Sequence, residues 1–266
     1  MRVSKTSRGA AMRRDWDERA QKDAFHYVAT WRKDWTRETF LESGDEEYVK
    51  VVEPVLEEFE FVPDGASMLE IGCGAGRMTG SFARRFATVN ALDISTKMQD
   101  FAKENLAEFR NIHWIIGDGT TFSAVPSDCV DFVFSYLVLQ HLPTEDLVLT
   151  YIREMVRVLK PSGIFLFQYN GTERATMNWK GRLAWGAVDA LWDLKLRRAS
   201  QAVARLLGFD PGTAGKSWRG ASLRAGKVVE TLRAVGGIAV QITGDLTPMV
   251  WCRGKKAARV APDARV

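Results

Sequence analysis

The feature that most constrains the fold is a short apolar strand that leads directly into a glycine-rich turn, from Met68 to Arg77. Residues 61–65 before it are typical of a loop, and residues 78–86 after it predict an amphipathic helix. A strand, a tight turn and a helix in this order place the free N–H groups of a helix N-terminus at the carboxyl end of a parallel strand. Since α/β sheets bind ligands at that edge, we expect an α/β protein with its site there.

The spacing of the glycines narrows the ligand. Gly72, Gly74 and Gly76 form G-x-G-x-G, whereas the dinucleotide fingerprint needs its third glycine one place later, where Arg77 stands. The carboxylate of Glu70, just before the turn, would repel a pyrophosphate group. A cationic ligand with an amino group suits Glu70 better.

Composition bounds the class of protein. A chain of 266 residues with 46% hydrophobic residues fits one large α/β domain with additions, and no apolar run approaches the ~20 residues needed to span a membrane. The basic N-terminus lacks the apolar stretch of a secretory signal. The three cysteines and three histidines are scattered, which predicts neither a disulfide framework nor a metal site and suits the cytoplasm.

Further strands are predicted at residues 88–93, 112–116, 129–135, 164–169, 238–243 and 248–253, with helices between most of them. The second strand ends in Asp93, about twenty residues after the glycine turn, where an acid can accept hydrogen bonds from a ribose diol.

Four features in this order resemble the class I S-adenosylmethionine-dependent methyltransferases of the small-molecule type: Glu70 with its glycines, Asp93, Asp118-Gly119, and the run from Ser135 to Leu142. The resemblance covers residues 67–167 and the closing strands. It implies a three-layer α-β-α sandwich around a seven-stranded, mostly parallel sheet whose last strand is antiparallel. It also implies S-adenosylmethionine as the cofactor.

The resemblance suggests a role for each position. Glu70 and the backbone near Gly72 and Ser135 would bind the methionine portion, and Asp93 would bind the ribose. The residues expected to contact the cofactor are Glu70, Gly72, Cys73, Gly74, Gly76, Asp93, Ile94, Met98, Asp118, Gly119, Ser135, Tyr136 and Gln140, with Trp16, Arg19 and Tyr27 from an N-terminal segment.

Candidates for catalysis lie in the run after the fourth strand. His141 is the only histidine there, and it is either a base for the acceptor's proton or a structural bridge to the next helix. Tyr136 and Gln140 are alternatives for orienting the acceptor.

We expect four parts in the chain. Residues 1–62 form an N-terminal helical segment that either packs on the sheet or closes over the cofactor, with residues 1–10 disordered. Residues 63–170 and 221–254 form the core, residues 171–220 a helical substrate cap after the fifth strand, and residues 255–266 a basic tail.

The acceptor is the least constrained element. Residues 172–227 carry eleven Lys and Arg against four Asp and Glu, a local charge of +7, and several tryptophans. This favours a small-molecule acceptor with an apolar body, such as a specialised metabolite. RNA is disfavoured because the excess charge is modest and no RNA-binding module is evident. A lipid or quinone acceptor reached by peripheral membrane contact, and a non-catalytic cofactor-binding subunit, remain alternatives. The sequence does not indicate an oligomeric state.

Overall fold

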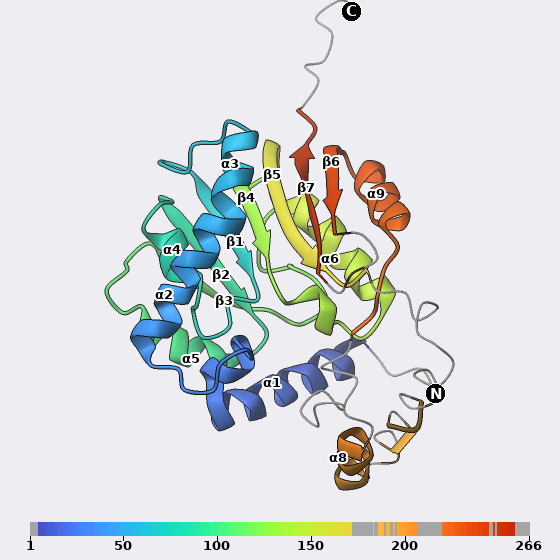
Figure 1. The fold of residues 1–266 in the computed structure, drawn as a ribbon. Helices are drawn as coiled ribbons and strands as arrows, with labels where there is room; N and C mark the ends of the chain where they lie inside the picture. The colour runs from blue at the N-terminus through green and yellow to red at the C-terminus, as the bar shows by residue number, and fades with distance from the viewer. Residues whose placement is uncertain are drawn as a thin grey trace, which may run out of the picture.

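The computed structural model describes residues 5–171, 196–206, 220–244 and 249–258, with the shorter pieces 183, 186–188, 190–191, 194 and 247. Seven strands form one sheet in the order β3-β2-β1-β4-β5-β7-β6 (Figure 1). The strands are β1 Ser67–Ile71, β2 Thr88–Asp93, β3 Ile112–Ile116, β4 Val130–Ser135, β5 Leu159–Tyr169, β6 Gly237–Thr243 and β7 Val250–Lys256. β7 is antiparallel to β5 and β6, and the other neighbouring pairs are parallel. The predicted seven-stranded sheet with an antiparallel last strand is confirmed.

Helices cover both faces of this sheet. They are α1 Lys5–Val28, α2 Arg37–Glu47, the π-helical turn η1 Tyr48–Val52, α3 Glu53–Glu58, α4 Thr79–Ala83, α5 Thr96–Asn105, the 3₁₀ turn η2 Leu139–His141, α6 Glu145–Val158, α8 Arg197–Leu206 and α9 Ala225–Ala234. In Figure 1, α1 crosses below the carboxyl ends of the central strands. In the described part of the chain, no helix is long and apolar enough to cross a membrane.

The core has one layer on each face because strand side chains alternate. Leu69 and Ile71 of β1 pack in the layer that contains α6 and α9. Met68, the residue before Leu69, packs in the layer that contains α3 and α4, where Phe82 and Phe132 are fully buried. Both faces of the central strands are therefore apolar, as a parallel sheet requires.

The N-terminal segment is more helical than predicted. α1 begins at Lys5, so the expected disorder of residues 1–10 was wrong for its second half. Asp23 has non-helical backbone angles inside α1, and its carboxylate accepts a hydrogen bond from the backbone N–H of His26. Asp23 is therefore the N-cap of the helical turn that follows it and ends α1. Pro54 lies in the first turn of α3, where its missing N–H costs no hydrogen bond within the helix.

Two strand ends differ from their predicted positions. β5 begins at Leu159, five residues before the predicted strand at 164–169, and it contains a bulge, since Val130 pairs with Leu159 and Phe132 pairs with Ile164. β7 extends to Lys256, so the first two residues of the predicted tail belong to the sheet. The predicted cap at residues 171–220 lies mostly outside the described residues, apart from α8 and a few single positions.

Candidate functional site

The glycine turn after β1 is built for close contact. Gly72 and Gly74 have φ values of 77° and 53°, in the left-handed region that favours glycine. A Cβ on Gly72 would lie 2.1 Å from Cγ2 of Val138, and one on Gly74 would lie 2.8 Å from Cγ2 of Val28. The turn is therefore packed between the loop after β4 and helix α1, with no room for side chains.

Asp93 joins this turn to the end of β2. Its Oδ2 accepts a hydrogen bond from the backbone N–H of Gly74 at 2.9 Å, and its Oδ1 accepts one from that of Ser95 at 2.7 Å. Burial raises the pKa of Asp93, although these N–H groups counteract the rise. The carboxylate has lone pairs left for hydroxyl donors, because each oxygen can accept more than one hydrogen bond.

Glu70 is the second buried acid of the site. Its Oε2 accepts a hydrogen bond from the hydroxyl of Thr79 at 2.6 Å. Burial raises its pKa from 4.5 to about 7, while the Thr79 bond and the charge of Arg77 act in the opposite direction. A cationic ligand would stabilise the ionised form of Glu70 and so bind favourably here.

The loop after β4 brings Tyr136, Gln140 and His141 to the same edge. The hydroxyl of Tyr136 donates to the carboxylate of Glu47, and burial raises its pKa to about 12. Nε2 of Gln140 lies 3.3 Å from Nε2 of His141. His141 is 8% exposed, and its ring meets that of Trp16 edge-on at 5.3 Å between centroids.

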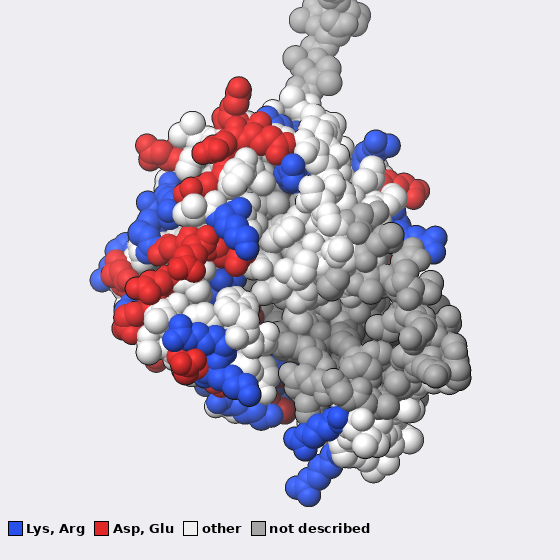
Figure 2. Space-filling model, in the orientation of Figure 1, with Lys and Arg blue, Asp and Glu red and all other residues white. Residues whose placement is uncertain are grey.

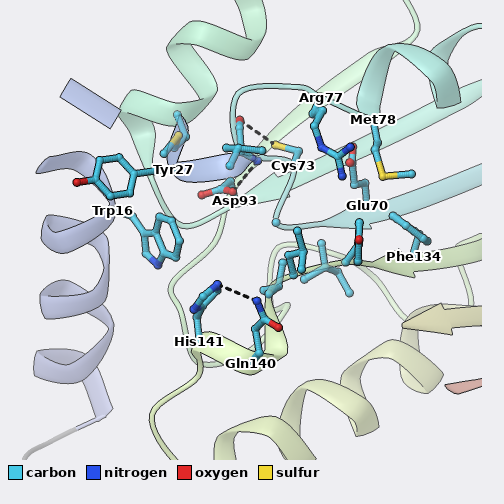
Figure 3. Close-up of a pocket in the computed structure, with 18 of the residues that line it drawn as sticks. Trp16, Tyr27, Glu70, Cys73, Arg77, Met78, Asp93, Phe134, Gln140 and His141 are labelled. Carbon is cyan, nitrogen blue, oxygen red and sulfur yellow. Dashed lines mark hydrogen bonds between the residues drawn. The ribbon is translucent and has the colours of Figure 1, made fainter. Parts of the chain in front are cut away.

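These groups line one cavity of about 340 Å³ (Figure 3). Figure 3 shows Asp93 between the rings of α1 and the glycine turn, with His141 and Gln140 on the opposite wall. The predicted residues that line the cavity are Trp16, Tyr27, Glu70, Gly72, Cys73, Gly74, Asp93, Met98, Tyr136, Gln140 and His141. The structure therefore brings together residues from α1, the glycine turn, β2, α5 and the loop after β4.

Six predicted residues do not line the cavity: Arg19, Gly76, Ile94, Asp118, Gly119 and Ser135. Ser135 instead donates its hydroxyl to the carbonyl of Ile71 at 3.3 Å. The guanidinium of Arg19 lies over the rings of Trp16 and Tyr27 and pairs with Asp15, so it supports the wall from behind.

Asp118 stabilises the turn in which it lies. Its carboxylate accepts hydrogen bonds from the backbone N–H groups and hydroxyls of Thr120 and Thr121. Burial would raise its pKa, but these bonds outweigh burial and the pKa is lowered. Its predicted contact with the cofactor would require one of the remaining lone pairs of the carboxylate. Next to it, a Cβ on Gly119 would lie 2.4 Å from Cδ1 of Ile94, so these two residues pack directly on each other.

Helix α1 is fastened over this edge by residues that sequence reasoning missed. Arg13 donates from Nε to the carbonyl of Ile94 at 3.0 Å and from Nη2 to that of Gly117 at 2.8 Å. Asp17 accepts hydrogen bonds from the hydroxyl of Ser95 and from the N–H of Lys97. An Arg and an Asp at i and i+4 share a helix face, but nothing in the sequence says which strands that face meets.

Arg77 is a further missed wall residue. It is 4% exposed, lies over the rings of Trp31 and Tyr136 at 5.1 and 5.6 Å, and donates to the carbonyl of Ser43. Burial lowers its pKa. The sequence held one sign of this role, because Arg77 stands at the position where the dinucleotide fingerprint has its third glycine.

Comparison with known proteins identifies the domain. Residues 69–167 match the family described as "Methyltransferase domain". The structure of magnesium protoporphyrin IX methyltransferase from Synechocystis PCC 6803, with bound S-adenosylhomocysteine, has a similar fold. It superposes with a TM-score of 0.58 at 18% identity and covers 93% of this chain and 99% of that one. The chain contains a class I S-adenosylmethionine-dependent methyltransferase domain.

Two curated relatives extend the similarity beyond this methyltransferase domain. Malonyl-(acyl-carrier protein) O-methyltransferase of Methylococcus capsulatus is 30% identical over 152 residues, which are 55% of this chain and 53% of that protein. Demethylmenaquinone methyltransferase of Tropheryma whipplei is 26% identical over 151 residues, 56% of each. The chain spans only 19–56% of the length of the curated relatives it matches.

S-adenosylmethionine is the cofactor of this methyltransferase domain, and the residues present fit it. The turn has no Cβ atoms at Gly72 and Gly74, where they would clash with neighbouring side chains, so a ligand can approach the bare backbone. Glu70 and Asp93 carry buried carboxylates, which accept hydrogen bonds. Glu70 therefore suits the ammonium group of the methionine portion, and Asp93 suits the hydroxyls of the ribose, since both of these groups are donors. The walls are otherwise largely apolar, which keeps water from a reacting centre.

Proposed function

We propose that the protein transfers a methyl group from S-adenosylmethionine to an oxygen or nitrogen nucleophile of a small-molecule acceptor. One observation carries this proposal. The two acids suited to the cofactor, Glu70 and Asp93, line the same cavity as His141 and Gln140. A cofactor held by the acids would therefore share one cavity with side chains that can accept or donate an acceptor's proton.

The chemistry asked of the protein is modest. When bound, S-adenosylmethionine would supply a methyl group attached to a positively charged sulfonium, and the sulfur would remain as a neutral thioether after transfer. The chain's part is to hold the acceptor in line, exclude water and receive the acceptor's proton. We assign the proton to His141, because an imidazole is a base near neutral pH. Tyr136 is a poor base, since its hydroxyl is bonded to Glu47 and its pKa is about 12.

A small acceptor suits the character of the walls. Trp16, Trp31 and Tyr27 supply aromatic surface, and Arg77 supplies a buried positive charge. Such walls favour a flat or apolar body with an acidic group. On the face in Figure 2, acidic and basic residues intermingle over α2 to α5, with no continuous basic track in the described part of that face. This pattern does not favour RNA.

A lipophilic acceptor is the second candidate. Leu194, Leu196 and Leu206, in and next to α8, are 69%, 52% and 86% exposed. Arg198 and Arg205 of α8 are exposed beside them, and Figure 2 shows basic side chains projecting there. Exposed leucines with arginines are typical of a helix that lies at a membrane surface, where quinones and lipids reside. The demethylmenaquinone methyltransferase among the relatives is in line with this alternative.

The test has two stages. The first is calorimetric titration with S-adenosylmethionine, S-adenosylhomocysteine and NAD, in which we expect binding of the first two only. The second is transfer of a labelled methyl group to a panel of hydroxylated and carboxylated small molecules, malonyl-acyl-carrier protein, demethylmenaquinone and RNA. Transfer to small water-soluble molecules supports the main proposal, and transfer to the quinone alone supports the second candidate. Tight cofactor binding without transfer to any of them would instead favour a non-catalytic subunit.

A further inference from the structure

Helix α6 places one tyrosine at the wall of the cavity. Tyr151 lines the cavity and is 5% exposed, and its ring packs edge-on against that of Phe122 at 4.9 Å between centroids. Within the part of the chain that the structure describes, its hydroxyl makes no hydrogen bond. The hydroxyl is not sealed inside the protein either. It therefore opens into the cavity that the side chain lines.

A hydroxyl in this position is unusual for a core tyrosine. Buried tyrosines normally form a hydrogen bond with their hydroxyl, because burial of the group without a partner costs free energy. The ring of Tyr151 belongs to the apolar layer that contains Leu92 of β2 and Phe122, where a phenylalanine would pack equally well. The hydroxyl adds nothing to this packing, so its place at the cavity wall indicates a ligand as its partner.

The order of the strands shows which part of the cofactor comes near. β2 lies between β1 and β3 in the sheet. Glu70 lies near the carboxyl end of β1, and Asp93 ends β2. In S-adenosylmethionine the ribose lies between the methionine portion and the adenine base. With the ammonium group at Glu70 and the ribose at Asp93, the base must extend past β2 toward the carboxyl end of β3.

Tyr151 lies on that side of Asp93. Its edge-on partner Phe122 follows the turn of Asp118 after β3, and the backbone N–H of Phe122 donates to the carboxylate of Glu154 in α6 at 2.9 Å. This bond holds the segment after β3 against α6. Burial and the carboxylates of Asp118 and Asp93 raise the pKa of Tyr151, so the hydroxyl stays protonated and can both donate and accept a hydrogen bond.

We propose that Tyr151 is a cofactor-binding residue whose hydroxyl forms a hydrogen bond with the adenine base of S-adenosylmethionine. The edge of adenine carries ring nitrogens that accept and an amino group that donates, and a neutral hydroxyl suits either. Tyr151 thereby helps to select adenine at the end of the cavity nearest β3. The proposal concerns the cofactor of the methyltransferase domain and does not depend on which acceptor is methylated.

Calorimetric titration of the full chain with S-adenosylhomocysteine, without any acceptor, tests this contact. Tyr151→Phe should weaken binding by about 3- to 10-fold, because one hydrogen bond is lost. Tyr48→Phe is the matched control, because Tyr48 is 1% exposed and packs edge-on against Phe82 at 5.3 Å but does not line the cavity. The control should bind as wild type does. An unchanged Kd in Tyr151→Phe would refute the proposal.

Thermal unfolding of the unliganded variants separates a ligand contact from a structural one. Tyr151→Phe breaks no hydrogen bond within the described part of the protein, so its midpoint should be no lower than that of wild type. The rise in midpoint on addition of S-adenosylhomocysteine should be smaller than in wild type, because a ligand stabilises the folded state according to its affinity. A lower midpoint without ligand would show that the hydroxyl serves the fold and would overturn the proposal.

Analogues of S-adenosylhomocysteine identify the group that Tyr151 binds. The panel contains the 1-deaza, 3-deaza and 7-deaza forms and the inosine form, in which oxygen replaces the amino group. At least one of these changes should weaken binding to wild type but have little further effect in Tyr151→Phe, since the same hydrogen bond is already absent there. The 2′-deoxy and 3′-deoxy forms should lose the same factor in both proteins. Coupling of Tyr151 to a ribose hydroxyl alone, or to none of these changes, would overturn the assignment to the base.

Steady-state kinetics provide a separate readout. With an acceptor in hand, Tyr151→Phe should raise the KM for S-adenosylmethionine and leave kcat within about twofold of wild type, because the base lies away from the transferred methyl group. A fall in kcat with KM unchanged would mean that the hydroxyl acts on the reaction instead of the base, which contradicts the proposal. The expected binding pattern in a protein that transfers no methyl group would refute the proposed function and leave this contact standing.

Discussion

The carboxylate of Asp93 accepts a hydrogen bond from the backbone N–H of Gly74 at 2.9 Å, which joins the end of β2 to the glycine turn after β1. The residue expected to bind the ribose thus also holds the turn expected to bind the methionine portion. We predict that Asp93→Ala weakens S-adenosylmethionine binding by roughly 10- to 100-fold, because hydrogen bonds to a charged group are lost. Calorimetric titration measures this change.

Asp93→Asn separates the negative charge of the side chain from its hydrogen bond to the glycine turn. An amide oxygen can still accept from Gly74, while the negative charge and the acceptor for the N–H of Ser95 are lost. The hydrogen bond to the turn should remain, so this variant should unfold at a higher temperature than Asp93→Ala and its binding should weaken less. Equal losses in both variants would show that charge, not the tie to the turn, is what matters.

The glycine turn makes a second prediction. Gly72→Ala places a methyl group 2.1 Å from Cγ2 of Val138, in addition to the strain of a φ of 77°. Gly65 has the same φ of 77°, but nothing lies within 4 Å of the position of its Cβ. Gly65→Ala should therefore cost only about 1–2 kcal/mol of unfolding free energy, the backbone term alone.

Urea unfolding of the two variants isolates the packing term. Gly72→Ala should lose clearly more stability than Gly65→Ala and should also bind S-adenosylmethionine more weakly. Equal losses would mean that Val138 moves aside freely and that the turn is not tightly packed.

Helix α1 should behave as a fastened lid. Arg13→Gln removes the donors to the carbonyls of Ile94 and Gly117, which lie at the ends of β2 and β3. We expect faster hydrogen exchange in α1 and a several-fold weaker Kd for S-adenosylmethionine, since about 1–2 kcal/mol of contact is lost. Arg14→Gln is the matched control, because Arg14 is adjacent and exposed. Identical exchange in the two variants would argue against the fastening.

The order of the strands along the chain and the position of the site at their carboxyl ends could be predicted from the sequence, because both depend on local patterns. Short apolar runs indicated each of the seven strands, and the carboxyl ends of those strands located Glu70 and Asp93. The side-chain contact of Ser135 could not be predicted from the sequence, because its hydroxyl bonds to the carbonyl of Ile71, which is 64 residues away. Arg13 was missed because its partners lie 81 and 104 residues away, and only the packed fold brings them together.

Tyr136 should be dispensable for chemistry. Its hydroxyl is bonded to Glu47 and its pKa is about 12, so at neutral pH it does not take up a proton. Tyr136→Phe should keep kcat within a few-fold of wild type on any acceptor that wild type methylates. His141→Ala should lower kcat by roughly 100-fold, the usual effect of losing a general base. The reverse ranking in a methyl-transfer assay would assign the chemistry to Tyr136 instead.

Glu70 should make the free protein less stable as the pH rises. Burial raises its pKa from 4.5 to about 7, so between these values the folded protein binds more protons than the unfolded chain. Unfolding free energy then falls with increasing pH across that window, by about 3 kcal/mol in total from this group. Glu70→Gln does not titrate, so the variant should lose this part of the fall. Denaturant unfolding at pH 5 and pH 8 measures the difference, and parallel pH dependences in the two proteins would contradict a raised pKa at Glu70.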